Sequence, residues 1–343
     1  MEEDPEETPK DDGGRLTSRM PVIEVEDLRK VYRVPVKEEG FLSFVRHLLS
    51  RKYRDIEAVK GVSFKVSKGE VVGFLGPNGA GKTTTLKMLV GLIKPTSGRV
   101  RVLGYDPFER KKDFLKRITL VMGQKQQLIW DLPPIDSLRI NAAVYEIPED
   151  VFKRRLVLLS DMLSIGNQLY QPVRKLSLGE RMKAEILAAL IHSPEILFLD
   201  EPTLGLDVSA QISIRDFLRR YNSEFGATII LTSHYMGDVE ALCDRVIVIH
   251  KGRMIFDGDL YDLGERVMPF KEIYVEFKGR IPLEELSRIG EVREIEGQEV
   301  KILVKREEAF EKVRLIMDRY DVDDLSVTDP PLDEVLAKVF EER

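Results

Sequence analysis

The stretch Gly76-Pro77-Asn78-Gly79-Ala80-Gly81-Lys82-Thr83 decides the fold of this chain. It fits the pattern G-x-x-x-x-G-K-[ST], a loop that wraps nucleotide phosphates. The apolar run 70–75 before it reads as a strand, and residues 84–90 after it read as the start of a helix. Glycines let backbone N–H groups converge on phosphates, and the helix N-terminus adds partial positive charge. The pattern therefore predicts a nucleotide site within a strand–loop–helix unit of an α/β fold.

The polar side chains at the end of this loop have separate predicted roles. Lys82 is expected to reach the β- and γ-phosphates, where it also stabilises the charge of the reaction, and the Thr83 hydroxyl is expected to bind Mg²⁺. Thr84 is expected among the nucleotide-binding residues next to them. The loop therefore predicts a nucleotide with Mg²⁺ as its ligand, and by itself it leaves kinases, GTPases and ATPases open.

Two adjacent carboxylates end a second apolar run. Ile196-Leu197-Phe198-Leu199-Asp200-Glu201 suits a strand that is buried on both faces of a parallel sheet. Ligands of open α/β sheets sit beyond the carboxyl ends of the strands, so both acids should lie at the nucleotide. Asp200 is predicted to hold Mg²⁺, and Glu201 to act as the general base on the attacking water.

The pentapeptide Leu176-Ser177-Leu178-Gly179-Glu180 is similar to the L-S-G-G-Q signature of ATP-binding-cassette (ABC) transporters. Leu178 replaces the first glycine, and Glu180 replaces the glutamine. In order with the phosphate loop and the two acids, it makes the chain resemble the ATP-binding subunit of an ABC transporter of the drug- and lipid-exporter branch. The resemblance implies that Ser177 and Gly179 contact the γ-phosphate of ATP held by the opposite subunit, in a sandwich of two copies.

Smaller elements extend the resemblance. Tyr32 matches the aromatic residue that stacks on adenine in this family. Asp207 belongs to Gly205-Leu206-Asp207, which matches the loop that crosses the dimer interface. His234 matches the switch histidine that contacts the γ-phosphate, and among the four histidines it is the one expected at the end of a buried strand.

Residues directly after the apolar run 120–123 match a region that contacts the membrane partner in this family. Gln124 matches the glutamine that senses Mg²⁺ and the permease, although Gln126 and Gln127 are close rivals. In this family the groove beside that loop receives a short cytoplasmic helix of the permease. Trp130, the single tryptophan, suits either an interface anchor or the core.

Composition bounds the class of protein. The 343 residues are 43% hydrophobic and 33% charged, with a formal net charge of −6, which gives no general bias toward nucleic acid. No apolar run of about 18 residues occurs, and no secretion signal is recognised. We therefore expect a subunit at the cytoplasmic face of the membrane whose permease is a separate polypeptide. Cys243, the one cysteine, excludes an internal disulfide.

The chain divides into parts of different character. Residues 1–20 are acidic and predicted to be disordered, and Met20 could be the natural start. Residues 21–265 are predicted to form a P-loop ABC-ATPase core with an antiparallel edge sheet, whose helical arm covers about 126–185. Residues 266–343 show a β-α-β-β-α-β pattern plus a last helix, which predicts a small ferredoxin-like α+β domain.

One insertion has no counterpart in the core. The segment 33–57 contains apolar residues on one helical face of residues 40–52, flanked by basic residues. This pattern suits an interfacial or partner-binding helix, and equally a helix docked on its own domain.

The predicted function is ATP hydrolysis that powers a separate permease, with a drug-like, lipid or polysaccharide substrate for export. The alternative is an ABC ATPase without a pore, acting on ribosomes or DNA. Ribosome-acting members usually carry two cassettes in one chain, and repair members carry long heptad segments. Neither feature is present in this sequence.

Overall fold

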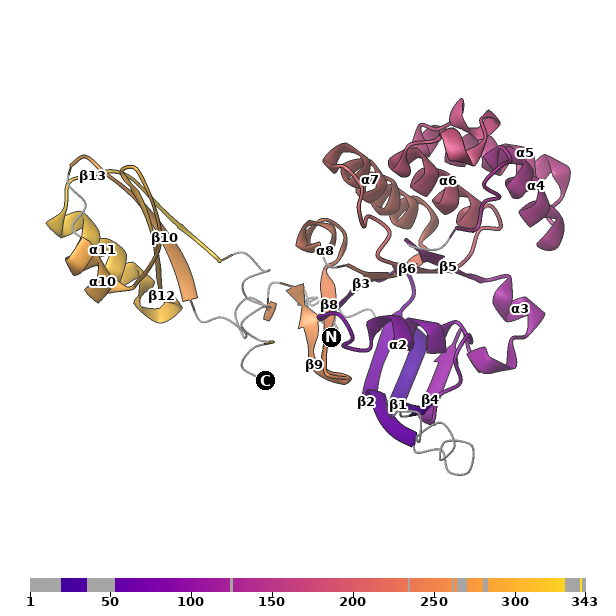
Figure 1. The fold of residues 1–343 in the computed structure, drawn as a ribbon, viewed down its shortest axis with the longest axis horizontal. Helices are drawn as coiled ribbons and strands as arrows, with labels where there is room; N and C mark the ends of the chain where they lie inside the picture. The colour runs from indigo at the N-terminus through magenta and orange to yellow at the C-terminus, as the bar shows by residue number, and fades with distance from the viewer. Residues whose placement is uncertain are drawn as a thin grey trace, which may run out of the picture.

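A computed structural model describes residues 20–35, 53–123, 126–233, 235–260, 262–263, 270–279, 283–330 and 340. These residues form three sheets and the helices that cover them (Figure 1). The acidic tail 1–19 and the predicted amphipathic helix at 40–52 lie outside the described residues.

A six-stranded sheet carries the predicted nucleotide site. Its order is β5-β6-β7-β3-β8-β9, with parallel neighbours except for the antiparallel pair β8–β9. The strands are β3 (Val71–Leu75), β5 (Ile118–Met122), β6 (Ile196–Asp200), β7 (Thr228–Thr232), β8 (Arg245–His250) and β9 (Arg253–Asp259). The runs of β6 and β7 are almost wholly apolar because helices or a second sheet cover both faces. The carboxyl ends of β3 and β6 therefore bring the phosphate loop and Asp200 to one edge.

Helices cover one face of this sheet (Figure 1). They are α4 (Pro134–Val144), α5 (Glu149–Leu163), α6 (Leu178–Leu190), α7 (Val208–Phe225) and α8 (Met236–Leu242), with the short 3-10 helices η2 (Gln168–Tyr170) and η3 (Val173–Lys175). Leu197 and Leu199 of β6 share a core with Leu187 of α6 and Leu218 of α7. The helices expected between residues 126 and 185 are present, and α6 begins in the signature pentapeptide.

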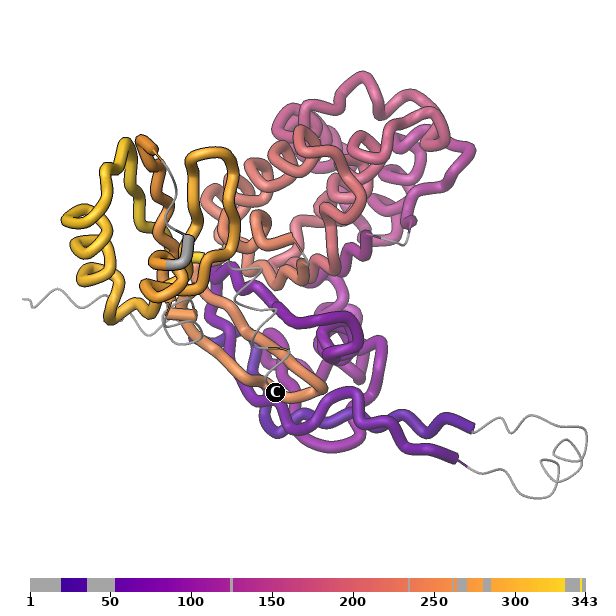
Figure 2. Tube along the Cα trace, turned by 60° about the vertical axis from the view of Figure 1, so that its left-hand side comes forward, coloured from indigo at the N-terminus to yellow at the C-terminus, as the bar shows by residue number. Residues whose placement is uncertain are grey.

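The opposite face packs on α2 (Lys82–Leu89) and an antiparallel sheet of order β2-β1-β4. This sheet contains β1 (Pro21–Pro35), β2 (Tyr53–Ser67) and β4 (Ser97–Val102), and η1 (Pro107–Glu109) and α3 (Lys112–Leu115) follow it. The Phe64 and Phe74 rings meet edge to face with centroids 5.2 Å apart, which joins the two sheets. The ends of the 33–57 insertion extend β1 and β2 into a long ribbon, because Arg33 pairs with Asp55 (Figure 2).

The C-terminal part has the predicted ferredoxin-like pattern. Its elements are β10 (Phe270–Phe277), α10 (Leu283–Ile289), β11 (Glu291–Glu296), β12 (Glu299–Lys305), η4 (Arg306–Glu308), α11 (Ala309–Arg319) and β13 (Val322–Thr328), and the sheet order is β11-β12-β10-β13. Ile273 and Val275 of β10 pack with Ile316 of α11 in a core of their own. Of the predicted last helix, only Phe340 is described, and its ring stacks on His250 of β8 at 5.3 Å.

Candidate functional site

The phosphate loop between β3 and α2 leaves no room for side chains at two of its glycines. Gly76 has a φ of 147°, and a Cβ on it would lie 2.1 Å from the carbonyl oxygen of Ile249. Gly81 has a φ of 111°, and its Cβ would lie 2.6 Å from the carbonyl oxygen of Ala58. The backbone of the loop is thus held between β8 and β2, and the loop leads directly into the N-terminus of α2. This cradle fits nucleotide phosphates.

Lys82 lies within this loop with 5% of its surface exposed. Its Nζ donates to the carbonyl oxygens of Gly76, at 2.5 Å, and Pro77, at 3.1 Å. Burial lowers the pKa of Lys82, and the nearby carboxylates of Glu201 and Asp200 partly oppose that shift. A bound phosphate would supply further negative charge beside the ammonium group and favour its charged form.

Asp200 meets Thr83 as the sequence predicts. The Oδ1 atom of Asp200 accepts hydrogen bonds from the hydroxyls of Thr83, at 3.1 Å, and Thr232, at 2.7 Å. Carboxylate and hydroxyl oxygens are the hard ligands that Mg²⁺ prefers, together with waters and phosphate oxygens. Within the described residues no group of three or more His, Cys, Asp or Glu could hold a metal ion.

Glu201 follows β6 in an unusual backbone conformation. Its φ is 54°, in the left-handed region that non-glycine residues seldom adopt. The Glu201 N–H is held by the carbonyl oxygen of Thr232 at 3.0 Å and by its Oγ1 at 3.1 Å. Such a strained conformation persists only where neighbours fix it, and it is common at catalytic sites. The turn directs the chain away from the sheet directly after Asp200.

The signature pentapeptide caps α6. Ser177 is the N-cap residue: its Oγ accepts from the Glu180 N–H at 3.2 Å, and Oε2 of Glu180 accepts from the Ser177 N–H at 2.9 Å. Gln168 donates to the other Glu180 oxygen at 3.0 Å. The hydrogen bond from the Ser177 N–H has the largest effect on the pKa of Glu180, and together with the bond from Gln168 it lowers that pKa. The departure from glutamine at this position therefore completes a capping box, which the S-x-x-E spacing could have predicted.

Gly179 is fixed by close packing. A Cβ on Gly179 would lie 2.7 Å from the Cβ of Ala210 on α7. Its neighbours Ser177 and Leu178 are exposed. Asp207 caps α7 in the same way as Ser177 caps α6, because its Oδ1 accepts from the Ala210 N–H at 2.9 Å. Asp207 is exposed as well, so its carboxylate remains accessible on this side of the molecule.

Comparison with known proteins agrees with this arrangement of loops. Residues 59–204 match the family described as ABC transporter, and residues 269–328 match the EvrA-like ABC transporter C-terminal domain. The ABC transporter ATP-binding protein NatA of Bacillus subtilis (strain 168) is 37% identical over 220 residues, which are 63% of this chain and 89% of that protein. The chain belongs to the family of ABC transporter ATP-binding proteins. It is therefore an ATPase.

Two further matches cover a similar share of this ABC protein. The linearmycin resistance ATP-binding protein LnrL of Bacillus subtilis (strain 168) is 36% identical over 219 residues, which are 64% of this chain and 70% of that protein. A solved structure described as the ATP-binding subunit of an ABC transporter matches with a TM-score of 0.58 and 26% identity, covering 71% of this chain and 92% of that one. The predicted family and fold class are confirmed.

Tyr32 lies on β1 near the phosphate loop. It pairs with Ile56 of β2, two residues before Ala58, whose carbonyl oxygen packs on Gly81. The Tyr32 ring is partly exposed, and the Lys30 ammonium lies 5.2 Å from its centroid. An aromatic ring can stack on any base, and the stacking of Tyr32 on adenine stays a prediction.

Two predicted residues of the site, Gln124 and His234, lie outside the described residues. The expectation that His234 alone ends a buried strand needs correction, because His250 is the last residue of β8 and is 8% exposed. The sequence suggested a turn after His250, but the strand reaches that turn. His250 stacks on Phe340 and therefore belongs to the packing of the C-terminal end.

The loop after Gln124 is anchored by a residue that the sequence analysis missed. Glu185 of α6 is 4% exposed, and its carboxylate accepts from the backbone N–H groups of Gln127, at 2.9 Å, and Leu128, at 3.3 Å. Burial raises the pKa of Glu185, and these two bonds partly oppose the rise. The sequence did carry a signal for this role, an acidic residue on the apolar face of a predicted helix. Such a residue is buried with the helix face and needs hydrogen-bond partners there.

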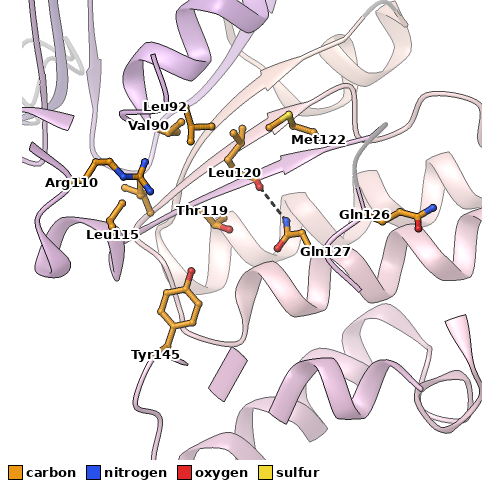
Figure 3. Close-up of a pocket in the computed structure, with 11 residues that line it drawn as sticks. Val90, Leu92, Arg110, Leu115, Thr119, Leu120, Met122, Gln126, Gln127 and Tyr145 are labelled. Atoms are coloured by element: carbon orange, nitrogen blue, oxygen red, sulfur yellow. Dashed lines mark hydrogen bonds between the residues drawn. The ribbon is translucent and has the colours of Figure 1, made fainter. Parts of the chain in front are cut away.

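A pocket of about 430 Å³ lies beside this loop, along the edge strand β5 (Figure 3). Leu120, Met122, Gln127 and Tyr145 are among its lining residues, and Gln127 donates to the carbonyl oxygen of Leu120 at 3.2 Å. Trp130 follows on the surface with 45% exposure, and the Arg181 guanidinium lies 5.7 Å from its ring. The core alternative for Trp130 is therefore wrong.

Among the described residues, no helix combines the length and apolar character that crossing a membrane requires.

Proposed function

We propose that this chain is the ATP-hydrolysing subunit of an exporter, in which two copies drive a separate membrane permease from the cytoplasmic face. The observation that carries the proposal is the convergence of Lys82, Thr83, Asp200 and Glu201 at one edge of the parallel sheet. The two hydrogen bonds of Asp200 and the buried ammonium of Lys82 support it.

In this proposal the chain's own residues position the phosphates and move one proton. The phosphate loop binds the β- and γ-phosphates through backbone N–H groups, and Lys82 turns its ammonium group toward them. Thr83 and Asp200, with Gln124, would hold Mg²⁺, which would supply positive charge to neutralise the charge that develops on the phosphate oxygens. Glu201 takes the proton of the attacking water, and His234 contacts the γ-phosphate, as the family resemblance implies.

The second copy supplies the other side of the ATP site. Ser177 is exposed, and its Oγ accepts the bond of the capping box, so its O–H group remains a donor for a phosphate oxygen of the opposite copy. The dimer interface would also include Leu178, which is 40% exposed and lies beside Gly205. Binding of ATP between the two copies closes the dimer, and hydrolysis opens it.

The permease would dock beside the glutamine loop. The pocket along β5 is open and next to Gln127, and Trp130 presents an exposed aromatic anchor. The direction of transport rests on the resemblance to the exporter branch and on a relative named for linearmycin resistance, which favours a drug-like substrate. An ABC ATPase without a pore has no observation in its favour here.

The test is vectorial transport. Inside-out membrane vesicles that contain this chain and a co-expressed multi-span permease should accumulate a labelled amphipathic drug only with ATP. Vesicles with Glu201→Gln should not accumulate the drug, whereas vesicles with Glu224→Gln, a change at an exposed helix position, should match the wild type. ATP-driven accumulation in right-side-out vesicles alone, or ATPase activity that follows ribosomes rather than membranes, would overturn the proposal.

A further inference from the structure

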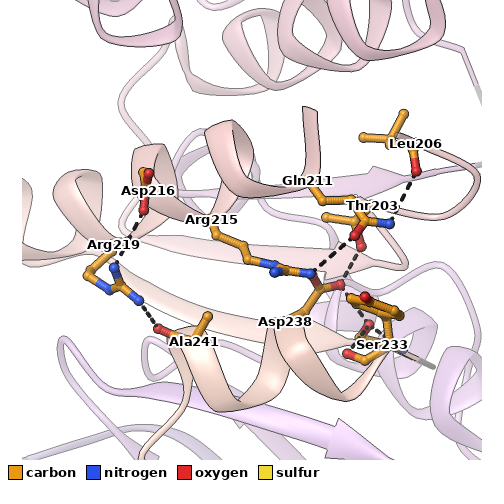
Figure 4. Close-up of polar contacts among 10 residues, drawn as sticks. Thr203, Leu206, Gln211, Arg215, Asp216, Arg219, Ser233, Asp238 and Ala241 are labelled. Atoms are coloured by element: carbon orange, nitrogen blue, oxygen red, sulfur yellow. Dashed lines mark hydrogen bonds and ion pairs between the residues drawn. The ribbon is translucent and has the colours of Figure 1, made fainter. Parts of the chain in front are cut away.

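A buried carboxylate joins two loops of the catalytic edge (Figure 4). Asp238 of α8 is fully buried, with 0% exposure. Its Oδ2 accepts a hydrogen bond from Oγ1 of Thr203 and another from Oγ of Ser233 at 2.8 Å. Its Oδ1 accepts from Nε of Arg215 on α7 at 2.6 Å. Three elements that are distant in sequence therefore meet at one side chain.

The two hydroxyl partners belong to the loops that carry the catalytic groups. Thr203 is the second residue after Glu201, and Ser233 directly precedes His234 in the chain. The Ser233 Oγ also accepts from the N–H of Tyr235 at 2.9 Å, which fixes the far side of that loop. Asp238 thus links the backbone turn at Glu201 with the turn after β7.

The network continues to the loop that is predicted to cross the dimer interface. The guanidinium of Arg215 donates to Oε1 of Gln211 at 3.3 Å, and Nε2 of Gln211 donates to the carbonyl oxygen of Leu206 at 3.2 Å. The same guanidinium lies 5.2 Å from the centroid of the Tyr235 ring. The residues 205–207 are therefore tied to α8 through two side chains.

The two loops are separated in part by a cavity. A cavity of about 170 Å³ lies between them, and its lining includes Glu201, Thr203, Ser233 and Tyr235. Side chains on opposite sides of such a cavity do not touch, so they add no packing contacts that would fix the distance between the two backbones. The hydrogen bonds to Asp238 connect Thr203 and Ser233, which both line the cavity, and add to those from the Glu201 N–H to Thr232.

A buried carboxylate is a costly way to stabilise a fold. Taking a charge out of water costs several kcal/mol, which good pairing offsets, and apolar replacements of buried ion pairs are often as stable. The benefit of such a group is then its geometry, because hydroxyl and guanidinium partners fix distance and direction together.

We propose that Asp238 is a positioning residue for ATP hydrolysis, which holds the Glu201 loop and the Ser233–Tyr235 loop in one fixed arrangement. The inference rests on the proposed role of Glu201 as the base. It assigns to Asp238 no contact with the substrate. A loose loop would displace the carboxylate of Glu201 relative to the water, and a misplacement of about 1 Å can cost about 100-fold in rate.

The test compares Asp238→Asn with Asp216→Asn, a control at an exposed acid of α7 whose partner is Arg219. Asp238→Asn should lower kcat about 10- to 100-fold and leave KM for ATP and the binding of a fluorescent ATP analogue within about twofold. The control should match the wild type in all three measurements. Thr203→Val should reproduce the loss of kcat, and Thr203→Ser, which keeps the hydroxyl, should restore most of it.

The dependence on Glu201 separates this inference from the proposed function. In the background of Glu201→Gln, the change Asp238→Asn should cost less than about twofold, since the group that it positions is already removed. A normal rate in Glu201→Gln alone would overturn the proposed function. A slow Glu201→Gln together with normal kcat in Thr203→Val and Asp238→Asn would overturn the role of Asp238 only. If Asp238→Asn does not fold, the Thr203 pair decides.

Discussion

Gly123 and Glu201 lie in backbone contact, because a Cβ on Gly123 would stand 2.2 Å from the carbonyl oxygen of Glu201. The Gly123 N–H donates to the carbonyl oxygen of Asp200 at 2.9 Å. Gly123 directly precedes Gln124, so the start of the glutamine loop touches the strained residue after β6. A displacement of that loop by a partner would reach Glu201 through the backbone alone.

This contact predicts the effect of a single methyl group. Gly123→Ala should lower kcat about 100-fold, because the new Cβ forces the Glu201 backbone to move, while ATP affinity stays near that of the wild type. Steady-state kinetics and ATP-analogue titration measure both quantities. Gly166→Ala is the control, since a Cβ there has no neighbour within 4 Å. Equal kcat in the two variants would show that the site tolerates the displacement.

A change in the signature pentapeptide is expected to impair the dimer of two copies rather than ATP binding by one copy. Ser177→Arg should abolish ATP-driven dimerisation, because the bulky charge lies where the opposite copy's phosphate would sit. A single subunit should still bind ATP through Lys82. Light scattering and ATP-analogue binding report the two effects. A monomer affinity reduced as strongly as in Lys82→Ala would show that Ser177 serves its own nucleotide.

The capping box predicts how Glu180 contributes to stability. Glu180→Ala should lower the free energy of unfolding by about 0.5–1 kcal/mol, whereas Glu180→Gln, which keeps an acceptor oxygen, should lose less. The folded-state pKa of Glu180 is lowered, so the carboxylate's share is present above its ordinary pKa of 4.5 and disappears as the pH falls below it. Urea unfolding at pH 7 and pH 4 measures both effects. Equal losses for Gln and Ala at pH 7 would refute the hydrogen-bond explanation.

The buried His192 is expected to make the stability of the fold sensitive to acid. It is 9% exposed, its ring stacks on Tyr145 at 3.9 Å, and its Nε2–H donates to the carbonyl oxygen of Ile118 at 3.1 Å. Burial lowers the pKa of His192 from 6.5 to about 4. The neutral ring therefore stabilises the fold fully above pH 6.5, and the stability falls by up to about 3 kcal/mol between pH 6.5 and 4. Thermal unfolding of His192→Gln should show a smaller fall over that window, and an identical fall would exclude His192.

Local patterns predicted the parts of the site that are close in sequence. The phosphate loop and the acids after β6 are recognised by short motifs, and parallel strands must bring their carboxyl ends to one edge. The meeting of Thr83 with Asp200 followed from those two facts alone. The order of elements along the C-terminal part, β-α-β-β-α-β, was predicted from local sequence pattern in the same way.

Long-range polar contacts could not be predicted. Asp238 meets Thr203, 35 residues earlier in the chain, and Arg215, 23 residues earlier, and no sequence motif relates these positions. The strand was predicted to end at Ile249, before the turn Lys251-Gly252, and the pairing of His250 with Arg253 of β9 extends it by one residue. The predictable part of the site is thus its phosphate chemistry, whereas the arrangement of its loops depends on tertiary structure.

The central claim is that Glu201 is the base of ATP hydrolysis in a dimer of this chain. The most direct test is the ATPase rate of purified Glu201→Gln, measured together with its mass in solution with ATP. We expect hydrolysis about 10²- to 10⁴-fold slower than in the wild type, near-normal ATP binding and a stable ATP-bound dimer. Near-normal turnover, or a variant that remains monomeric with saturating ATP, would contradict the account.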